Sequence, residues 1–378
     1  MKIRRTFGIY YFALFCLWLS ACHQKAADNI GKPSSNVKLV GKEPNRYKTT
    51  LYFAGDIMMH LPQQKAAIQS NGTYNFDSCF SLIKPYIDKA DIAIANLETT
   101  FGGKPYSGYP MFSSPDTLAY SLKRAGFDVL TTANNHCADR GSKGIVRTLN
   151  VLDQVEIRHT GSFRNNRERG RLSPLIICSN GINIALLSYT YGTNGMPVKT
   201  PTEVNMIDST MLSDVRSARA NKKVDCVIIY LHWGIEYQSH SNYQQRYLAK
   251  QLADAGADII VGSHPHVVQE SDVITNDKGK NTLVFYSLGN YISNQSSNLC
   301  TTGGLSILVT LTKEKKRGVN ICDLEYIHTW VNRHDNEGAM KFVVVPLDGN
   351  FQIGKNHQNY GAMKAYLRYA KTIPLAKI

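Results

Sequence analysis

Short apolar runs that lead into polar residues recur six times along this chain, and no other feature constrains the fold as much. Runs of this kind, bounded by glycine, proline or polar residues, are typical of buried β-strands. The six runs cover residues 51–54, 92–95, 129–130, 227–231, 259–261 and 283–286. Functional groups of sheet proteins gather on the loops just beyond the strand ends. We therefore expect one site, assembled from segments that are distant in the sequence.

Each run is followed closely by a side chain that can bind a metal ion, move a proton or contact a substrate. These residues are Asp56, Glu98, Asn135, His136, His232, His264, His266 and Asn290. Carboxylate, amide and imidazole groups together suit one or two divalent ions such as Zn, Mn or Fe. His264 and His266 are two positions apart, so on an extended chain both rings face the same side. Asp139 is expected either to orient His136 or to cap the helix after Gly141, and Glu236 is a candidate carboxylate behind the ligands.

Taken singly, these residues also have structural interpretations that the sequence leaves open. Asp56 is a favoured helix cap, and Asn135 can be a turn residue. His232 can be a core histidine bonded to the backbone, and a surface turn can contain His264 and His266. Their shared position at strand ends is what favours a metal site, because a buried carboxylate needs a partner and a cation is the natural one.

The first residues predict export. Basic residues at positions 2, 4 and 5 precede an apolar stretch over 7–19, which is short for a bilayer span, and the stretch ends in Leu19-Ser20-Ala21-Cys22. This pattern is typical of a lipoprotein signal peptide over 1–21 with Cys22 lipidated; an ordinary secretory signal or a signal anchor is the alternative. Residues 22–47 favour a flexible tether. We expect a membrane-anchored lipoprotein of the cell envelope, outside the cytoplasm.

The net positive charge of the chain bears on which molecules it can bind. A net charge of +14 is consistent with a patch for an anionic substrate, polymer or lipid head group. A diffuse basic surface near an anionic membrane explains the same charge, since lysine and arginine are scattered along the sequence. The sequence contains none of the usual nucleic-acid-binding motifs, and export argues against that partner.

The remaining pattern predicts a layered α/β domain around stacked sheets, because helical and strand-like stretches alternate before strands dominate. The clearest expected helices cover residues 115–125, 143–154, 209–220, 243–255 and 360–370. A further helical stretch is expected over 80–89. Strands are expected to dominate from residue 267 onward.

Six short motifs that contain the candidate site residues follow one another over residues 49–300. They are Gly55-Asp56, Asn96-Leu97-Glu98, Asn134-Asn135-His136 with Asp139, His232-Trp233-Gly234-Ile235-Glu236, Gly262-Ser263-His264-Pro265-His266, and Ser287-Leu288-Gly289-Asn290. This set resembles the CapA family of capsule synthesis, which is linked to poly-γ-glutamate. The resemblance implies a four-layer α/β/β/α sandwich similar to the calcineurin-like, metallo-dependent phosphatases. It also implies a CapA-like domain over 48–300, completed by strands and a helix over 301–378.

The resemblance further implies a role for each site residue. Asp56 and His266 would bind a first metal ion, Asn135, His232 and His264 a second, and Glu98 stands where a bridging Asp is usual. His136 would be the acid near the leaving group. The phosphatases' Asp-x-His is here Asp56-Ile57-Met58, so one ligand of the first metal is missing. Their Gly-Asp-x-x-Asp is replaced by Asn96-Leu97-Glu98.

Three functions remain open on these grounds. The first is a lipid-anchored, metal-dependent hydrolase or transferase in the synthesis, export or processing of an anionic polymer such as poly-γ-glutamate. The second is a metallophosphoesterase or nucleotidase, which rests on the fold alone. The third is a non-catalytic, polymer-binding component of a capsule export complex.

Overall fold

The computed structural model describes residues 46–314, 318–336, 338–347 and 357–378. The predicted signal peptide, Cys22 and nearly all of the predicted tether lie outside these residues. The last two tether positions, Arg46 and Tyr47, belong to the first strand. Among the residues that the structure describes, no helix has the length and apolarity needed to span a membrane.

The first sheet is built around the apolar run that ends at Asp56. Within the described residues its strand order is β16-β15-β14-β1-β2-β3-β4, and β13 pairs with the end of β1. The strands are β1 (Arg46–Ile57), β2 (Ile92–Leu97), β3 (Val129–Thr131), β4 (Arg158–Thr160), β13 (Asn290–Ile292), β14 (Gly303–Glu314), β15 (Gly318–Asn336) and β16 (Ala339–Pro346). Because β1, β2, β3 and β4 are parallel, their carboxyl ends lie along one edge of the sheet.

The second sheet has the order β11-β12-β10-β9-β7-β6. Its strands are β6 (Leu175–Ser179), β7 (Ile182–Thr190), β9 (Cys226–His232), β10 (Ile259–Ser263), β11 (Ser271–Thr275) and β12 (Asn281–Phe285). The parallel strands β7, β9 and β10 end in register, with Thr190 beside His232 and His232 beside Ser263. A short antiparallel pair, β5 (Ser162–Phe163) and β8 (Glu203–Val204), lies outside both sheets.

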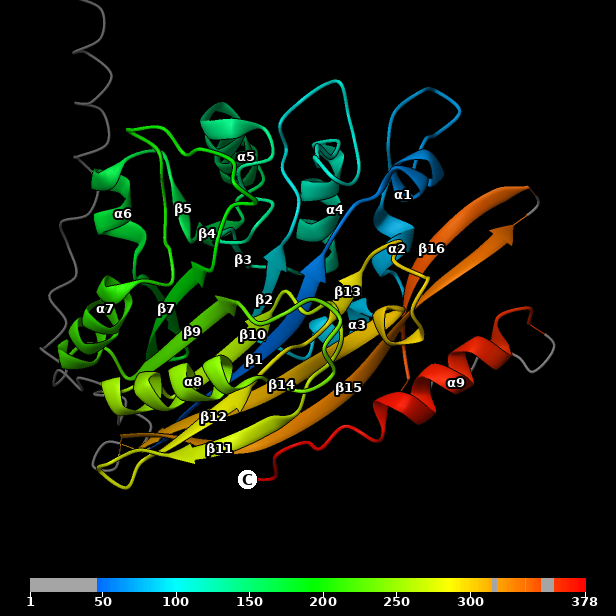
Figure 1. The fold of residues 1–378 in the computed structure, drawn as a ribbon. Coiled ribbons are helices and arrows are strands. Elements are labelled where there is room, and N and C mark those ends of the chain that lie inside the picture. Colours follow the sequence, from blue (N-terminus) through cyan, green and yellow to red (C-terminus); the bar gives the residue numbers. More distant parts are fainter. Residues whose placement is uncertain (1–45, 315–317, 337, 348–356) are drawn as a thin grey trace, which may run out of the picture. The chain divides into compact units, whose positions relative to one another are not determined.

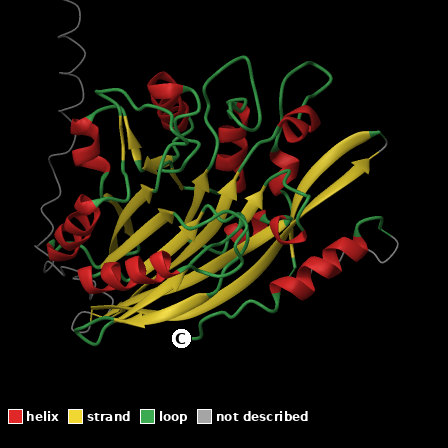
Figure 2. Ribbon diagram, in the orientation of Figure 1, coloured by secondary structure: helices red, strands yellow, loops and turns green. Residues whose placement is uncertain are grey.

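Most helices lie on the outer side of each sheet, whereas the C-terminal helix α9 (Tyr360–Ala370) packs on the face of the first sheet that also meets the second sheet (Figures 1 and 2). Their bounds are α1 (Leu61–Ala66), α2 (Asp77–Phe80), α3 (Lys84–Ile87), α4 (Thr117–Ala125), α5 (Gly141–Gln154), α6 (Asn166–Leu172), α7 (Ser209–Ala220), α8 (Tyr243–Ala255) and α9 (Tyr360–Ala370), with a 3₁₀ turn at Leu299–Thr301. The helix expected over 80–89 is shorter than predicted: α2 ends at Phe80, and α3 begins at Lys84 with a proline in its first turn.

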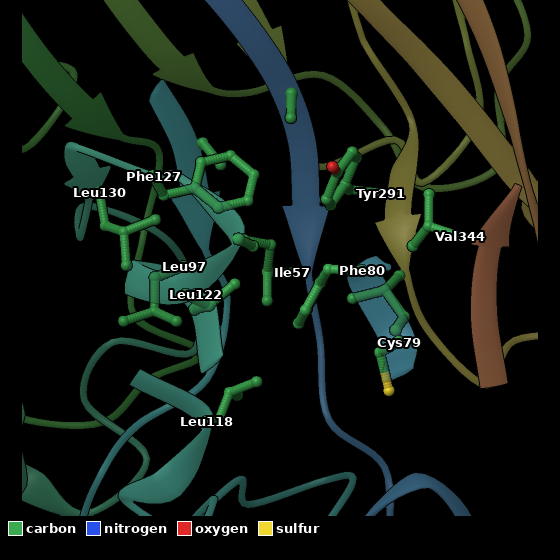
Figure 3. Packing of buried hydrophobic residues seen from close by; sticks show 14 of the residues in the cluster. Ile57, Cys79, Phe80, Leu97, Leu118, Leu122, Phe127, Leu130, Tyr291 and Val344 are labelled. Carbon is green, nitrogen blue, oxygen red and sulfur yellow. The ribbon is translucent and has the colours of Figure 1, made fainter. Parts of the chain in front are cut away.

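Three apolar clusters hold the layers together. Between the sheets, Phe53 of β1 packs near Tyr230 of β9, with ring centroids 6.5 Å apart. On the outer side of the first sheet, α2 and α4 pack against β1 and β2 through residues that include Phe80 and Leu122 (Figure 3). On the outer side of the second sheet, α7 and α8 contribute residues such as Leu252. The predicted four-layer α/β/β/α sandwich is therefore confirmed.

Two glycines allow backbone segments to meet at the carboxyl ends of the central strands. A Cβ atom at Gly55 would lie 1.9 Å from the Gly289 carbonyl oxygen, and one at Gly262 would lie 1.9 Å from the Tyr286 carbonyl oxygen. The Asp56 N–H donates to the Gly289 oxygen at 3.0 Å. These close approaches bring the loop after β12 against both sheets, next to the polar residues that follow β1 and β10.

Candidate metal centre

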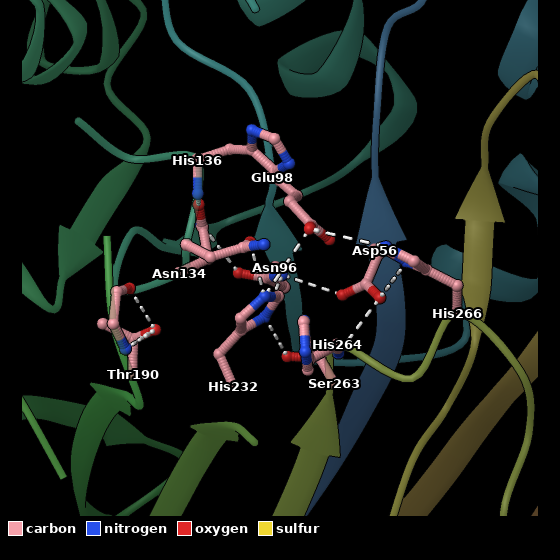
Figure 4. Close-up of polar contacts among 12 residues, drawn as sticks. Asp56, Asn96, Glu98, Asn134, His136, Thr190, His232, Ser263, His264 and His266 are labelled. Carbon is pink, nitrogen blue, oxygen red and sulfur yellow. Dashed lines mark hydrogen bonds and ion pairs between the residues drawn. The ribbon is translucent and has the colours of Figure 1, made fainter. Parts of the chain in front are cut away.

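Five side chains from four strand ends converge at the edge shared by the two sheets (Figure 4). All are almost completely buried: Asp56, Glu98, His232, His264 and His266. They form two groups, and within each group the potential ligand atoms lie within 4.8 Å of one another. One group is Glu98, His232 and His264, and the other is Asp56, Glu98 and His266. Glu98 belongs to both groups, and the CapA resemblance implies a bridging ligand at this position.

Several buried polar atoms of this site have no hydrogen-bond partner among the residues that the structure describes. They are both carboxylate oxygens of Glu98 and Nδ1 of His264. Burial, and then the nearby carboxylates of Asp56 and Glu236, raise the pKa of Glu98 well above its usual range. An unpartnered buried carboxylate is costly, and a cation is its natural partner. The residues present therefore fit a divalent metal held by oxygen and nitrogen ligands.

The side chain of Asn135 lies next to His232, in the donor group formed by Glu98, His232 and His264. Its Oδ1 lies 2.8 Å from His232 Nε2, and Glu98 Oε1 lies 3.5 Å from the same nitrogen. His232 Nδ1 lies 3.3 Å from Asn96 Nδ2, which can only donate, and 3.1 Å from Ser263 Oγ. Nδ1 therefore accepts from Asn96, and the Nε2–H of His232 donates to Asn135 Oδ1.

A chain of amides fixes the carboxylate of Asp56. Asn96 Nδ2 donates to Asp56 Oδ1 at 2.8 Å, and Asn134 Nδ2 donates to Asn96 Oδ1 at 3.2 Å. The backbone N–H of His264 donates to Asp56 Oδ2 at 3.2 Å, and His266 Nδ1 lies 3.3 Å from the same oxygen. These bonds show Asp56 engaged in the site and not as a helix cap, since His60 occupies the cap position of α1.

The loop that carries His264 and His266 is not extended, so the expectation of two rings on one side of a straight chain is wrong. β10 ends at Ser263, and the next residues turn: φ is 97° at His264 and 59° at His266. Their ring centroids nevertheless lie 6.0 Å apart. Left-handed conformations at non-glycine residues cost about 1–3 kcal/mol each and cluster at functional sites.

His136 and Asp139 form a buried pair beside the ligands. His136 Nδ1 lies 2.8 Å from Asp139 Oδ2, which also accepts the Phe112 backbone N–H at 2.7 Å. A carboxylate can only accept, so Nδ1 carries the proton and Nε2 is free to take or give one. Asp139 does not cap the following helix, because Arg140 occupies the cap position of α5.

Two other predicted site residues lie at the edges of this centre. Glu236 is exposed, yet its charge affects Glu98, so it lies at the mouth of the site. Asn290 is fully buried, and its Nδ2 donates to Gln295 Oε1 and to the Thr301 carbonyl, each at 2.9 Å. These bonds hold the segment after β13, and a contact between Asn290 and substrate stays a prediction.

The sequence suggests that His60 is a further ligand or, more readily, polar surface, but its ring is half-buried beside the site. Its ring packs edge-on against Phe112, with centroids 5.2 Å apart, and the Asn294 N–H donates to its Nδ1 at 3.3 Å. Burial lowers the pKa of His60 to about 4, with smaller effects from the charges of His266 and His136. The only signal in the sequence was its place just after the first strand. Met58, which replaces the phosphatase histidine, is buried.

The fold and the donor arrangement define an α/β/β/α sandwich protein with a candidate two-centre metal site at its strand ends. Residues 50–295 match the family model described as bacterial capsule synthesis protein PGA_cap, and the chain belongs to this family. The resemblance to the CapA family is thereby confirmed.

Individual relatives agree with this assignment. The capsule biosynthesis protein CapA of Bacillus anthracis is 32% identical over 267 residues, which cover 67% of this chain and 62% of that protein. The PGA biosynthesis protein CapA of Bacillus subtilis is 31% identical over 254 residues, covering 64% of this chain and 63% of that protein. This chain thus spans less than two thirds of the length of either relative.

Among solved structures, the NAD nucleotidase NadN of Haemophilus influenzae aligns with a TM-score of 0.48 and 13% identity, over 88% of this chain and 57% of that one.

Proposed function

We propose that this protein is a metal-dependent hydrolase or transferase that acts on a capsule polymer in the cell envelope. The observation that carries the proposal is the pair of donor groups that share Glu98, next to a histidine held by a carboxylate. Membership of the PGA_cap family supports the link to capsule synthesis. An anionic polymer such as poly-γ-glutamate is the substrate class that the CapA resemblance implies.

The residues divide the chemistry between them. Asp56, Glu98 and His266 would hold one ion, and Glu98, Asn135, His232 and His264 would hold another. A bound divalent ion would supply Lewis acidity to an amide, ester or phosphoester and stabilise developing negative charge. His136 would transfer a proton through Nε2 to or from the reacting group, while Asp139 keeps the ring in the required tautomer. Asn96 holds the carboxylate of Asp56 in its orientation.

Metal content tests the proposal. The purified protein should contain about one or two equivalents of Zn, Mn or Fe, because two donor groups are present. The variant His264→Ala/His266→Ala should lose this metal in elemental analysis, since it removes one imidazole from each group. A matched control is His334→Ala/His357→Ala, another pair of histidines whose rings lie 5.7 Å apart. Wild-type protein that stays metal-free after reloading would refute the metal-dependent function.

We also propose that the protein is a lipoprotein with a signal peptide over 1–21, lipidation at Cys22 and a tether to about residue 47, all read from the sequence. Residues 48–300 would form the CapA-like part and 301–378 would complete it, which is supported by the place of β14, β15 and β16 in the first sheet. Cys22→Ser should move the protein from the membrane fraction to the soluble fraction, while Cys16→Ser should not. Retention of the Cys22→Ser variant in the membrane contradicts the anchor.

A further inference from the structure

Arg333 is a partly buried arginine near the edge of the first sheet that carries the candidate metal centre. β15 runs on past the first residue of β14, Gly303, and Arg333 belongs to the part of β15 that extends beyond it. This end of β14 adjoins the site, because Gly304 pairs with Gly289, whose carbonyl accepts the Asp56 N–H. Arg333 therefore lies at the same end of the strands as the metal ligands.

The backbone of Asn294 fixes both Arg333 and His60. Its N–H donates to His60 Nδ1 at 3.3 Å, and its carbonyl accepts from Nη1 of Arg333 at 3.4 Å. Nη2 of Arg333 also donates to the Gln295 carbonyl at 2.6 Å. The segment that follows β13 thus holds a guanidinium group and an imidazole ring close to each other.

His60 places this pair beside the groups of the metal centre. Its ring and that of His136 both pack edge-on against the Phe112 ring, with centroids 5.2 and 4.8 Å from it. Burial chiefly lowers the pKa of His60, and the charges of His266 and Arg333 lower it further. His60 is therefore near the proposed proton-transferring histidine, a metal ligand and the guanidinium group.

The guanidinium group of Arg333 has no carboxylate partner among the residues that the structure describes. Two of its five N–H groups meet neutral carbonyl oxygens, which leave its charge in place. Burial lowers its pKa, and no carboxylate of the described residues raises it. The Glu236 carboxylate acts instead on Tyr237, whose pKa is raised to about 12 by burial and then by Glu236. A partly buried charge without a partner is costly, so this position favours an anionic ligand.

His60 adds a neutral hydrogen-bond donor next to this cation. A backbone N–H can only donate, so Nδ1 of His60 accepts from Asn294 and Nε2 carries the ring proton. The side-chain oxygen of Gln63 lies 3.3 Å from Nδ1, but it already accepts the His60 backbone N–H at 2.9 Å. Within the described residues the hydrogen bonds of the ring are made at Nδ1, which leaves the Nε2–H for a ligand.

We propose that Arg333 and the Nε2–H of His60 form a subsite that binds a carboxylate of the substrate beside the metal centre. The planar fork of a guanidinium group matches a carboxylate, and a neighbouring N–H can bond to one of its oxygens. In a γ-linked glutamate chain, each free carboxylate is attached to the carbon next to an amide nitrogen. A carboxylate held in the subsite would therefore bring an amide bond towards His136. The substrate class rests on the proposed function, whereas the binding of a carboxylate does not.

The test compares the affinity for a short γ-linked glutamate oligomer with that for its uncharged methyl ester, using full-length protein purified in detergent. Wild-type protein should bind the oligomer more tightly than the ester. Arg333→Gln should weaken binding of the oligomer by about tenfold to 100-fold, the usual effect of hydrogen bonds to a charged group. Arg333→Lys keeps the charge but not the fork and should lose less. Neither variant should change the affinity for the ester.

Two further variants complete the comparison. His60→Phe keeps an aromatic ring against Phe112 but removes the Nε2–H, and it should weaken binding of the oligomer by about tenfold. Arg158→Gln is the matched control, because it also removes one positive charge and one bond to a backbone carbonyl, that of Ile176. Arg158 is the first residue of β4, so it lies at the opposite end of the parallel strands, and its loss should leave both affinities unchanged.

The outcomes separate this inference from the proposed function. Binding that depends on Arg333 in a protein that takes up no metal would support the inference and reject the metal-dependent function. A metal-loaded protein that cleaves the oligomer equally well after Arg333→Gln would keep that function and overturn the inference.

Other results also overturn the inference. Wild-type protein that binds oligomer and ester equally, or binds neither, has no carboxylate subsite. Equal losses for oligomer and ester in Arg333→Gln would mean that Arg333 only supports Asn294 and Gln295, and an equal loss in Arg158→Gln would mean that net charge alone decides. If Arg333→Gln does not fold, Arg333→Lys and His60→Phe decide by the same comparison.

Discussion

Replacing Glu98 with glutamine should abolish metal binding at both donor groups and at the same time stabilise the metal-free protein. Glu98 is the one residue that both groups share, so its loss leaves each with two of its three charged or imidazole ligands. We expect the affinity for Zn²⁺ to fall more than about 100-fold, beyond the effect of losing an outer partner. Without metal, the neutral amide removes a buried, unpartnered carboxylate next to Asp56, a gain of about 1–3 kcal/mol.

Two measurements check this prediction. Titration of chelator-treated protein with Zn²⁺ gives the affinity, and chemical denaturation in the presence of chelator gives the free energy of unfolding. Glu236→Gln is the control, because Glu236 is an exposed carboxylate near Glu98 that belongs to neither group. If Glu98→Gln is less stable than wild type without metal, then the carboxylate has a partner in solution and the bridging role is wrong.

Replacing His136 with asparagine should reduce turnover by about 10²–10⁴-fold while leaving the metal content unchanged, the usual size of a general acid–base contribution. His136 lies outside both donor groups, and its Nδ1 is engaged by Asp139. Asp139→Asn should also lower turnover, because an amide at this position can donate to Nδ1 and so favour the wrong tautomer. Assays use poly-γ-glutamate, bacterial glycans and generic phosphate and carboxylic esters as substrates.

His159→Gln provides the control for this experiment. His159 is also buried, and its Nε2 lies 3.1 Å from an aspartate, Asp153, but this pair is not part of the donor groups. A metal-bearing protein whose interaction with the polymer is indifferent to His136→Asn would be a binding component of a capsule export complex and not an enzyme. Wild-type protein that is loaded with metal yet cleaves none of the substrates rules out the hydrolase.

The helices of this fold could be predicted closely where local chemistry sets their ends. The predicted ranges 209–220 and 243–255 coincide with α7 and α8. The side chains of Asp208 and Asn242 accept N–H groups of the first turns, and Gly256 ends α8 in a left-handed conformation. The strand expected from residue 267 begins later, at Ser271. The reason is that residues after His266 belong to the loop of the site, which apolar composition does not reveal.

The candidate site was predictable to the extent that it follows from strand ends. Parallel strands of one sheet place their carboxyl ends together, so the approach of Asp56 and Glu98 needed no knowledge of loops. His232 ends a strand of the second sheet, so its place depends on how the two sheets pack. The packing of His60 against Phe112 depends on how long connections fold back over the site. Such connections have no periodic pattern in the sequence. Long-range packing, not local propensity, decides these features.

Because the candidate ligands are far apart in the sequence, metal binding depends on folding of the whole domain. Asp56 lies near the start of the described chain, while His266 lies far beyond it, and the strand that carries Asp56 also pairs with β14, at Gly303–Glu314. A chain that emerges unfolded on the far side of a membrane would hold no competent site until these late residues have joined the first sheet. Only completely folded molecules would then bind metal, so metal content would report the fraction of correctly folded protein.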